Sequence, residues 1–331
     1  MSVTITGGIS FGGGVGITAG PPTMTTAGWF GGGYNLGPGS AGRSTVERMT
    51  FATDTSALTI TGPLSQARRQ LGSAGTPTAG WFAGGYILGG GPGILSRVDR
   101  ITYSTDTATA SVRGPLASAR YYIAGTSNYT TNGWFGGGGN FGSPVSAVQS
   151  ITYSTDTATA VLRGPLSIAR TAVNSTGTSS YGWFMGGASP GVVSTIDRID
   201  YSNDTATASI RGPLASARYT GVGAVTDFTT YGWYGGGNSG PTSTLIQRVT
   251  FATDTATATN RGTLSGGVNQ FGGSVNNGTY GWIAGGGTPP NGGAGSSVIQ
   301  RITYANDTVG TTNVSNLSLG KAFLAGNSGV Q

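Results

Sequence analysis

One phrase of eighteen residues recurs three times almost unchanged, and this repeat constrains the fold more than any other feature. The copies read YSTDTATASVRGPLASAR at 103–120, YSTDTATAVLRGPLSIAR at 153–170 and YSNDTATASIRGPLASAR at 201–218, about fifty residues apart. Periods of roughly 20 to 50 residues are typical of solenoids, propellers and arrays, because every copy makes the same contacts with its neighbours.

Two markers extend the period to six copies. Six tryptophans each follow a glycine and precede an apolar residue: Trp29, Trp81, Trp134, Trp183, Trp233 and Trp282. Six aspartates are each followed by threonine: Asp54, Asp106, Asp156, Asp204, Asp254 and Asp307. Between the markers apolar and polar residues alternate, with β-branched and aromatic residues bounded by Gly, Pro, Asn and Asp, which predicts strands. No window has the apolar spacing of a helix, so we expect almost none.

Each repeat predicts four short strands. In the third of the six repeats, the one that contains Trp134, they cover roughly 120–127, 133–137, 147–154 and 158–163. Four-stranded antiparallel units repeated radially make a β-propeller, and closure of the ring limits exposed edges. We therefore expect an all-β, six-bladed propeller forming a single domain over 1–331. Terminal strands in 1–8 and 309–331 should close the ring or pair with a neighbouring subunit. VTITGGIS resembles the strand-four phrase LTITGPLS, and GKAFLAGNSG occupies a strand-one position.

Composition narrows the possible chemistry. The 331 residues include 63 Gly at fixed repeat positions, but neither Cys nor His. Disulfides, the usual zinc sites, thiol nucleophiles and imidazole bases are therefore excluded. No run of eighteen apolar residues suggests membrane insertion. The first residues, MSVTITGGIS, lack the pattern of a signal peptide, so we expect the chain to fold where it is made. We expect no cofactor.

The acidic residues predict structural roles. In T-D-T the carboxylate should accept backbone N–H bonds in an Asx-turn. Calcium is disfavoured, since it takes six to eight oxygens and each turn supplies one carboxylate. Five of the eleven acids remain: Glu47, Asp99, Asp197, Asp200 and Asp227. The sequence does not converge two of them on one bond, as a glycosidase would require. We therefore expect no enzyme activity and no metal site.

Thirteen of the sixteen arginines fall in three repeat positions, leaving Arg43, Arg69 and Arg97. The guanidiniums of the thirteen repeated arginines would bond carbonyls and turn acids between blades. Alternatively, they would form a ring that binds phosphate or acidic sugars at one mouth of the channel. The formal charge is +6, but it is spread by symmetry rather than interleaved with aromatics, so we expect no nucleic-acid partner. The tryptophans should fill the wedge between blades, with N–H groups on backbone acceptors; sugar stacking is the alternative.

The repeat resembles the kelch family. The resemblance rests on GWFGG, on the aromatic residue at 51, 103, 153, 201, 251 and 304, and on GPLASAR, and it covers nearly the whole chain. Kelch repeats usually carry a Trp about six residues after that aromatic, whereas TATA fills the position here. Kinship with kelch adaptor proteins therefore does not follow. The phrasing is more similar to kelch-like repeats in virion proteins of marine bacteriophages.

That resemblance implies a structural or adhesive virion protein in a phage tail, fibre or capsid decoration. Its partners would be other virion proteins, copies of itself or a host-surface glycan. The alternatives are a cellular lectin-like module, extracellular or at the cell surface, and a secreted enzyme.

The loops between strands two and three predict the binding face. The Trp-to-Asp spacing that contains them ranges from 21 to 25, and their composition varies most. Variable loops on a rigid frame often carry function, although they are also tolerated as exposed tips. We expect ligand or partner contacts from residues of these loops and from arginines at the same end: Tyr34, Tyr86, Asn140, Phe141, Asn238, Arg113, Arg163, Arg211 and Arg261.

Overall fold

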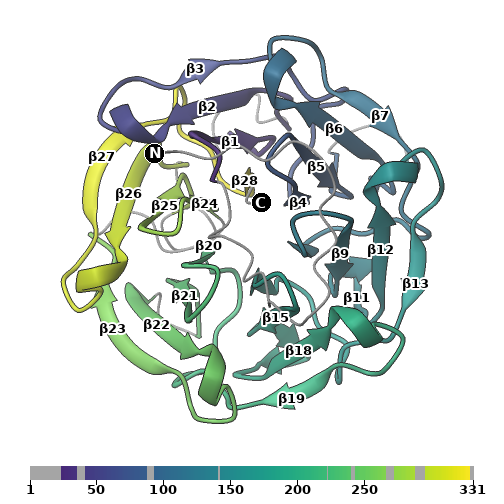
Figure 1. The fold of residues 1–331 in the computed structure, drawn as a ribbon, viewed down its shortest axis with the longest axis vertical. Coiled ribbons are helices and arrows are strands. Elements are labelled where there is room, and N and C mark those ends of the chain that lie inside the picture. Colours follow the sequence, from purple (N-terminus) through teal and green to yellow (C-terminus); the bar gives the residue numbers. More distant parts are fainter. Residues whose placement is uncertain are drawn as a thin grey trace, which may run out of the picture.

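Six four-stranded antiparallel sheets stand around a central axis, with the inner strands facing that axis (Figure 1). The computed structural model describes residues 24–35, 42–87, 93–140, 142–221, 223–239, 243–265, 272–287 and 295–328. Within these residues the only helices are six single 3-10 turns. The prediction of a six-bladed propeller is therefore confirmed.

Each blade consists of an inner, a second, a third and an outer strand, and blades 1 to 6 follow the order of the second strands in the chain. The inner strands are β28 (Ala325–Asn327), β4 (Gly72–Gly75), β8 (Ala124–Ser127), β14 (Asn174–Gly177), β20 (Gly223–Thr226) and β24 (Gly273–Asn276). The second strands are β1 (Ala27–Gly31), β5 (Ala79–Ala83), β9 (Asn132–Gly136), β15 (Tyr181–Met185), β21 (Tyr231–Gly235) and β25 (Tyr280–Ala284).

The third strands are β2 (Val46–Thr50), β6 (Val98–Thr102), β12 (Val148–Thr152), β18 (Ile196–Asp200), β22 (Leu245–Thr250) and β26 (Val298–Thr303). The outer strands are β3 (Thr59–Ile60), β7 (Ser111–Arg113), β13 (Val161–Arg163), β19 (Ser209–Arg211), β23 (Thr259–Thr263) and β27 (Thr312–Asn316). Small hairpins in two of the loops pair β10 (Gly139–Asn140) with β11 (Ser143–Pro144), and β16 (Ala188–Ser189) with β17 (Gly191–Val192).

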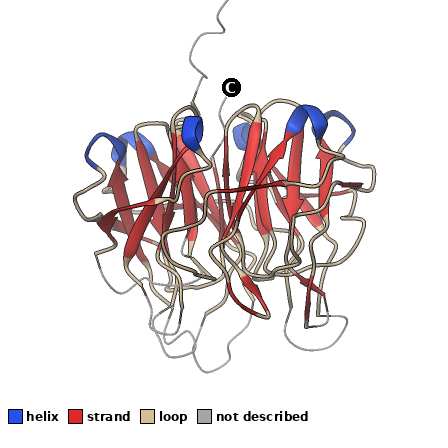
Figure 2. Cartoon of the chain, turned by 90° about the horizontal axis from the view of Figure 1, so that it is seen from below, coloured by secondary structure: helices blue, strands red, loops and turns tan. Residues whose placement is uncertain are grey.

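A 3-10 turn follows every third strand. The six turns are η1 (Phe51–Thr53), η2 (Tyr103–Thr105), η3 (Tyr153–Thr155), η4 (Tyr201–Asn203), η5 (Phe251–Thr253) and η6 (Tyr304–Asn306). They lie together at one end of the ring (Figure 2). Antiparallel order places the loops between second and third strands, and the crossovers from outer to inner strands, at the opposite end. We call that end the 2–3 face.

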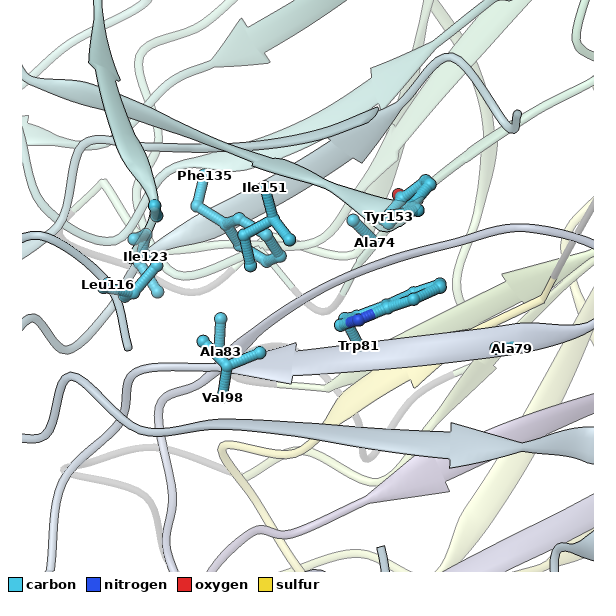
Figure 3. Packing of buried hydrophobic residues seen from close by; sticks show 11 residues of the cluster. Ala74, Ala79, Trp81, Ala83, Val98, Leu116, Ile123, Phe135, Ile151 and Tyr153 are labelled. Atoms are coloured by element: carbon cyan, nitrogen blue, oxygen red, sulfur yellow. The ribbon is translucent and has the colours of Figure 1, made fainter. Parts of the chain in front are cut away.

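The core consists of separate clusters between neighbouring blades. Between blades 2 and 3, Trp81 packs against Tyr153, with their ring centroids 4.0 Å apart, and Phe135 and Ile151 pack with Val98 (Figure 3). Second strands such as β5 are buried along their whole length because a blade covers each side. All six tryptophans are at most 4% exposed. Their predicted core position is confirmed, and burial on this scale rules out sugar stacking.

The prediction that the indole N–H groups bind backbone acceptors is wrong. Each donates to the marker aspartate of the following blade, as Trp81 does to Asp156 at 2.9 Å. The other pairs are Trp29–Asp106, Trp134–Asp204, Trp183–Asp254, Trp233–Asp307 and Trp282–Asp54. The Asx-turn expectation for these aspartates is also wrong. Each lies in a turn after a third strand, but its carboxylate accepts from the preceding blade, where it satisfies a buried donor and joins two sheets.

The end of the chain completes the first blade. β28 pairs antiparallel with β1, aligning Trp29 with Asn327 and Gly31 with Ala325. GKAFLAGNSG thus supplies a strand-one segment, as its position in the repeat suggested. The segment 1–8 lies outside the described residues. No helix in the described part of the chain is long and apolar enough to cross a membrane.

Candidate ligand-binding face

The 2–3 face is built where each glycine-rich loop meets a crossover. Tyr86, just after β5, forms an antiparallel bridge with Arg69, which precedes β4. The same bridge recurs as Tyr34 with Ala322, Gly139 with Tyr121, Thr171 with Ala188, and Tyr219 with Asn238. These backbone bridges therefore hold the loop and crossover positions together at one end of the ring, whatever side chains they carry.

Two of the predicted contact residues converge on one arginine. The guanidinium carbon of Arg69 lies 4.3 Å from the ring centroid of Tyr34 and 5.4 Å from that of Tyr86. It also lies 5.5 Å from the ring centroid of Phe323. A cation over the face of an aromatic ring is attracted by the ring quadrupole. Arg69 is therefore held by aromatic rings from two blades.

The aromatic surface continues onto blade 3. Tyr86 lies 5.9 Å from Tyr121, Tyr121 lies 5.2 Å from Tyr122, and Tyr122 lies 5.8 Å from Phe323, measured between ring centroids. We call these six residues the Arg69 patch: Arg69, Tyr34, Tyr86, Tyr121, Tyr122 and Phe323. Tyr34 is buried and the other five are half-buried. Burial raises the pKa of Tyr122, which therefore stays protonated and neutral at physiological pH.

Other predicted contact residues lie elsewhere. Asn140 is on blade 3 and Asn238 is on blade 5, outside the Arg69 patch. Phe141 lies outside the described residues.

The four outer-strand arginines do not serve the 2–3 face. Each pairs with the marker aspartate of the next blade: Arg113–Asp156 at 3.4 Å, Arg163–Asp204 at 3.2 Å, Arg211–Asp254 at 3.5 Å and Arg261–Asp307 at 2.6 Å. Their backbone lies opposite the start of the third strand, as in the Arg113–Val98 pair, but the guanidiniums reach across to the neighbouring blade. The expectation that they contact a ligand is not supported, and the inter-blade interpretation describes them correctly.

A second set of cations is buried below the 2–3 face. Arg68 and Arg170 form ion pairs with Asp99 and Asp197, at 2.7 and 2.8 Å. Lys321 pairs with Glu47 at 2.7 Å. All three acids are 0% exposed. These three carboxylates, which are among the five acids outside the TDT turns, neutralise buried cations.

In blades 3, 5 and 6 the third-strand acid is replaced by glutamine, and the crossovers into blades 3 and 5 still carry an arginine. Arg120 donates to the carbonyls of Gly137 and Ala147, while Arg218 donates to those of Gly236 and Leu245. Burial lowers the pKa of Arg120 to about 10, so it remains charged at neutral pH. Both arginines are therefore buried cations without a carboxylate partner among the described residues.

Unpaired charge is segregated along the axis. All charged side chains lie in described residues, and twelve of the seventeen cations form ion pairs. The other five are Arg43, Arg69, Arg97, Arg120 and Arg218. All five belong to the loops and crossovers of the 2–3 face, as the backbone bonds of Arg69 to Tyr86 and of Arg120 to Leu95 illustrate.

Two acids form no ion pair, and they lie at the opposite end. Asp200 ends β18, where hydrogen bonds from Ser202 lower its pKa. Asp227 follows β20 and accepts from the backbone of Thr229, Thr230 and Tyr231. The 2–3 face is thus the positive end of the ring. Within the described residues, no group of three or more acids is placed to hold a metal ion.

A channel of about 190 Å³ runs along the inner strands. At its 2–3 mouth, five non-glycine residues have φ between 55° and 61°: Gln70, Tyr122, Ala172, Thr220 and Phe323. This left-handed conformation is uncommon outside glycine and costs of order 1–3 kcal/mol per residue. Because it recurs at equivalent positions in five blades, it belongs to the crossover and not to one ligand. It places Tyr122 and Phe323 at the channel wall.

Sequence reasoning found Tyr34 and Tyr86 but missed four members of the patch. Arg69 was one of the three arginines outside the repeat positions, and that irregularity was the available signal. Tyr121, Tyr122 and Phe323 follow Arg120 and Lys321 in the crossovers. They lie outside the loops of variable length, so loop variability does not indicate them.

Comparisons with known proteins show the fold alone. Neither a protein-family model nor a curated protein matches the chain. Among solved structures, one titled "Structure of YjhT" is similar, with a TM-score of 0.66 at 15% identity, covering 88% of this chain and 98% of that chain. At this identity the similarity concerns architecture, and one architecture hosts many functions. The resemblance to kelch repeats and to phage virion proteins therefore stays a prediction.

Proposed function

We propose that this chain is a non-catalytic adhesive propeller of a virion, in a phage tail, fibre or capsid decoration. It attaches through its 2–3 face to an anionic partner, foremost a host-surface glycan and otherwise a neighbouring virion protein. The observation that carries the proposal is the segregation of unpaired charge. Five cations without a carboxylate lie at the 2–3 face, and the two acids without a cation lie at the other end. Such a field attracts anions and raises the rate of encounter.

The use of the acidic residues supports a binding role over a catalytic one. Nine of the eleven acids form ion pairs. The two others, Asp200 and Asp227, are engaged in turns at the end opposite the cations. Glycoside hydrolysis of the usual kind needs a pair of carboxyl groups beside the reacting bond. The carboxyl groups nearest the positive face, those of Glu47, Asp99 and Asp197, are already engaged in buried ion pairs.

The virion location is supported by the repeat phrase alone. A cellular lectin-like module would use the same face in the same way, so location and binding need separate tests. Immunogold labelling of phage particles with an antibody against this chain tests the location. We expect labelled tails, fibres or capsids. Label confined to the host cell surface would point to the lectin-like module.

A polysaccharide array tests the binding. The full chain should bind acidic bacterial polysaccharides more than neutral ones, and binding should fall as salt rises from about 50 to 500 mM, because screening shortens the reach of exposed charges. Equal binding to neutral and acidic polysaccharides, unaffected by salt, would contradict an electrostatic binding face. Release of shortened products during incubation would contradict the non-catalytic role.

A further inference from the structure

We propose that the Arg69 patch is the specificity subsite of the 2–3 face and that it binds a carboxylated sugar unit of an acidic polysaccharide. Arg69 would bind the carboxylate, and the tyrosines around it would pack against the sugar ring. This inference rests on the proposed function and gives it a ligand class and a place.

The first argument is that the aromatic patch is not needed to build the ring. Blade 4 makes the same bridge between loop and crossover with Thr171 and Ala188 in place of Arg69 and Tyr86. Its residue at the left-handed position is Ala172, where blade 3 has Tyr122 and blade 1 has Phe323. The backbone geometry is therefore achieved with small side chains. The gathering of five aromatic rings on blades 1 to 3 needs another explanation.

The second argument is the state of Arg69. Its Nε is buried without a hydrogen-bond partner among the described residues, and the guanidinium forms no ion pair there. The guanidinium carbon lies over the Tyr34 ring, 4.3 Å from its centroid, and the rings of Tyr86 and Phe323 also lie close to it, so its orientation is restrained. A guanidinium held in one plane presents parallel N–H donors that match a carboxylate in a two-point contact. Less conformational entropy is then lost on binding.

The third argument concerns ligand class. Binding sites commonly combine apolar and aromatic walls with a few polar groups that fix orientation. Half-buried tyrosines offer both ring faces and hydroxyl groups, which suits a sugar with its C–H face and its hydroxyls. A single-stranded nucleic acid would instead require cations that follow a backbone of several phosphates. The patch has one cation at its centre, so the geometry favours one carboxylate per site.

The test uses polysaccharides and their carboxyl-reduced forms. Polygalacturonate, alginate and hyaluronan are immobilised beside samples in which the carboxylates have been reduced to neutral alcohols. The full wild-type chain should bind at least one carboxylated polymer and lose at least tenfold in affinity for its reduced form. Binding to none of the three, or equal binding to the reduced forms, would overturn the proposal.

Variants then locate the subsite. The double variant Arg69→Thr with Tyr86→Ala installs the residues that blade 4 already uses, so it should keep the melting temperature while affinity falls at least tenfold. Arg97→Gln removes a positive charge from the same face but outside the patch, and should change affinity less than threefold. Arg69→Lys keeps the charge but loses the planar fork, so its affinity should fall nearly as far as that of the double variant.

Each contrary result is informative. Unchanged affinity in the double variant would overturn this subsite and leave the adhesive function standing. An equal loss in Arg97→Gln would show that net charge alone drives binding, which also overturns it. Competition by an oligothymidylate as strong as that by the acidic polymer would assign the patch to nucleic acid. If the double variant melts lower, Arg69→Lys at unchanged melting temperature carries the test.

Discussion

The indole Nε1–H of Trp282 donates to a carboxylate oxygen of Asp54 across 2.7 Å, although the two residues are 228 positions apart. Arg301 reaches the same oxygen at 2.9 Å. This contact joins blade 6 to the strands of blade 1 that come from the start of the chain. The chain passes from β27 of blade 6 into β28 of blade 1. The pairing of β28 with β1, which comes from the start of the chain, is non-covalent. The Trp282–Asp54 contact and the β28–β1 pairing therefore hold the ring closed together.

Asp54→Ala should destabilise the protein more than Asp106→Ala. Both variants remove one acceptor from a buried tryptophan and an arginine, since Asp106 accepts from Trp29 at 2.8 Å and from Arg48 at 3.1 Å. Leaving such donors unpaired costs about 1–3 kcal/mol. Asp54→Ala also weakens ring closure, which couples the blades. Urea unfolding measures both variants, and a larger loss in Asp106→Ala would contradict this role of Asp54.

Acid should weaken the inter-blade contacts, and Asp307 offers the clearest test. Its burial alone would raise its pKa, but hydrogen bonds from Arg261 and Trp233, with the charge of Arg248, lower the pKa below the ordinary value. A carboxyl with a lowered folded-state pKa stabilises the fold above its unfolded pKa of about 3.9. That stabilisation is lost as pH falls from there through the folded pKa.

Asp307→Asn removes this titration. The free energy of unfolding should therefore fall less steeply with acid below about pH 4 in Asp307→Asn than in the wild type. Chemical denaturation between pH 3 and pH 7 measures the two slopes. Parallel slopes would mean that Asp307 contributes nothing to the acid sensitivity.

The architecture could be predicted because the same pattern of strands and turns recurs six times along the chain. Period-two alternation, GWFGG and the TDT turn together predict strand order and blade number. The sequence could not show which blade each side chain serves. Asp106 looks like a local turn residue, but its carboxylate accepts from Trp29, 77 positions earlier. Arg113 likewise looks like part of a loop face, yet it pairs with Asp156. Both contacts cross a blade boundary, and a single repeat gives no sign of it.

The candidate site was predicted only in part for a related reason. Tyr34 and Tyr86 belong to loops whose variability drew attention. Arg69, Tyr121 and Phe323 belong to crossovers, and they meet the tyrosines only because the ring brings the inner end of each blade to one channel mouth. That convergence depends on ring geometry, which the order of residues along the chain does not display.

Buried arginines with and without an acid should respond differently to substitution. Arg68→Gln would leave Asp99, which is 0% exposed, without its cation, and breaking such a pair costs about 3–5 kcal/mol. Arg120→Gln would leave no acid behind, only the carbonyls of Gly137 and Ala147, and should cost about 1–3 kcal/mol. Urea midpoints compare the two.

A second substitution tests the cause of that difference. Asp99→Asn added to Arg68→Gln removes the stranded charge, so the double variant should regain part of the lost stability. If the double variant is less stable than Arg68→Gln alone, the penalty does not come from the unpaired carboxylate.

Gly114→Ala should destabilise the ring strongly, and it tests why the phrase RGP recurs. A Cβ at Gly114 would overlap the carbonyl oxygen of Ala158 in the next blade, and the same overlap recurs between Gly62 and Ala108. Gly114 also donates its N–H to the carbonyl of Asp156 at 2.8 Å, so the two backbones cannot move apart without breaking that bond. We expect a loss of about 3 kcal/mol or more, at the upper end of overpacking costs, because backbone rather than a side chain must give way.

Gly191→Ala is the matched control: Gly191 lies in β17, and a Cβ there would meet nothing within 4 Å. Thermal unfolding should show a large drop for Gly114→Ala and almost none for Gly191→Ala. Equal melting temperatures would mean that close approach between blades does not explain the repeated glycine.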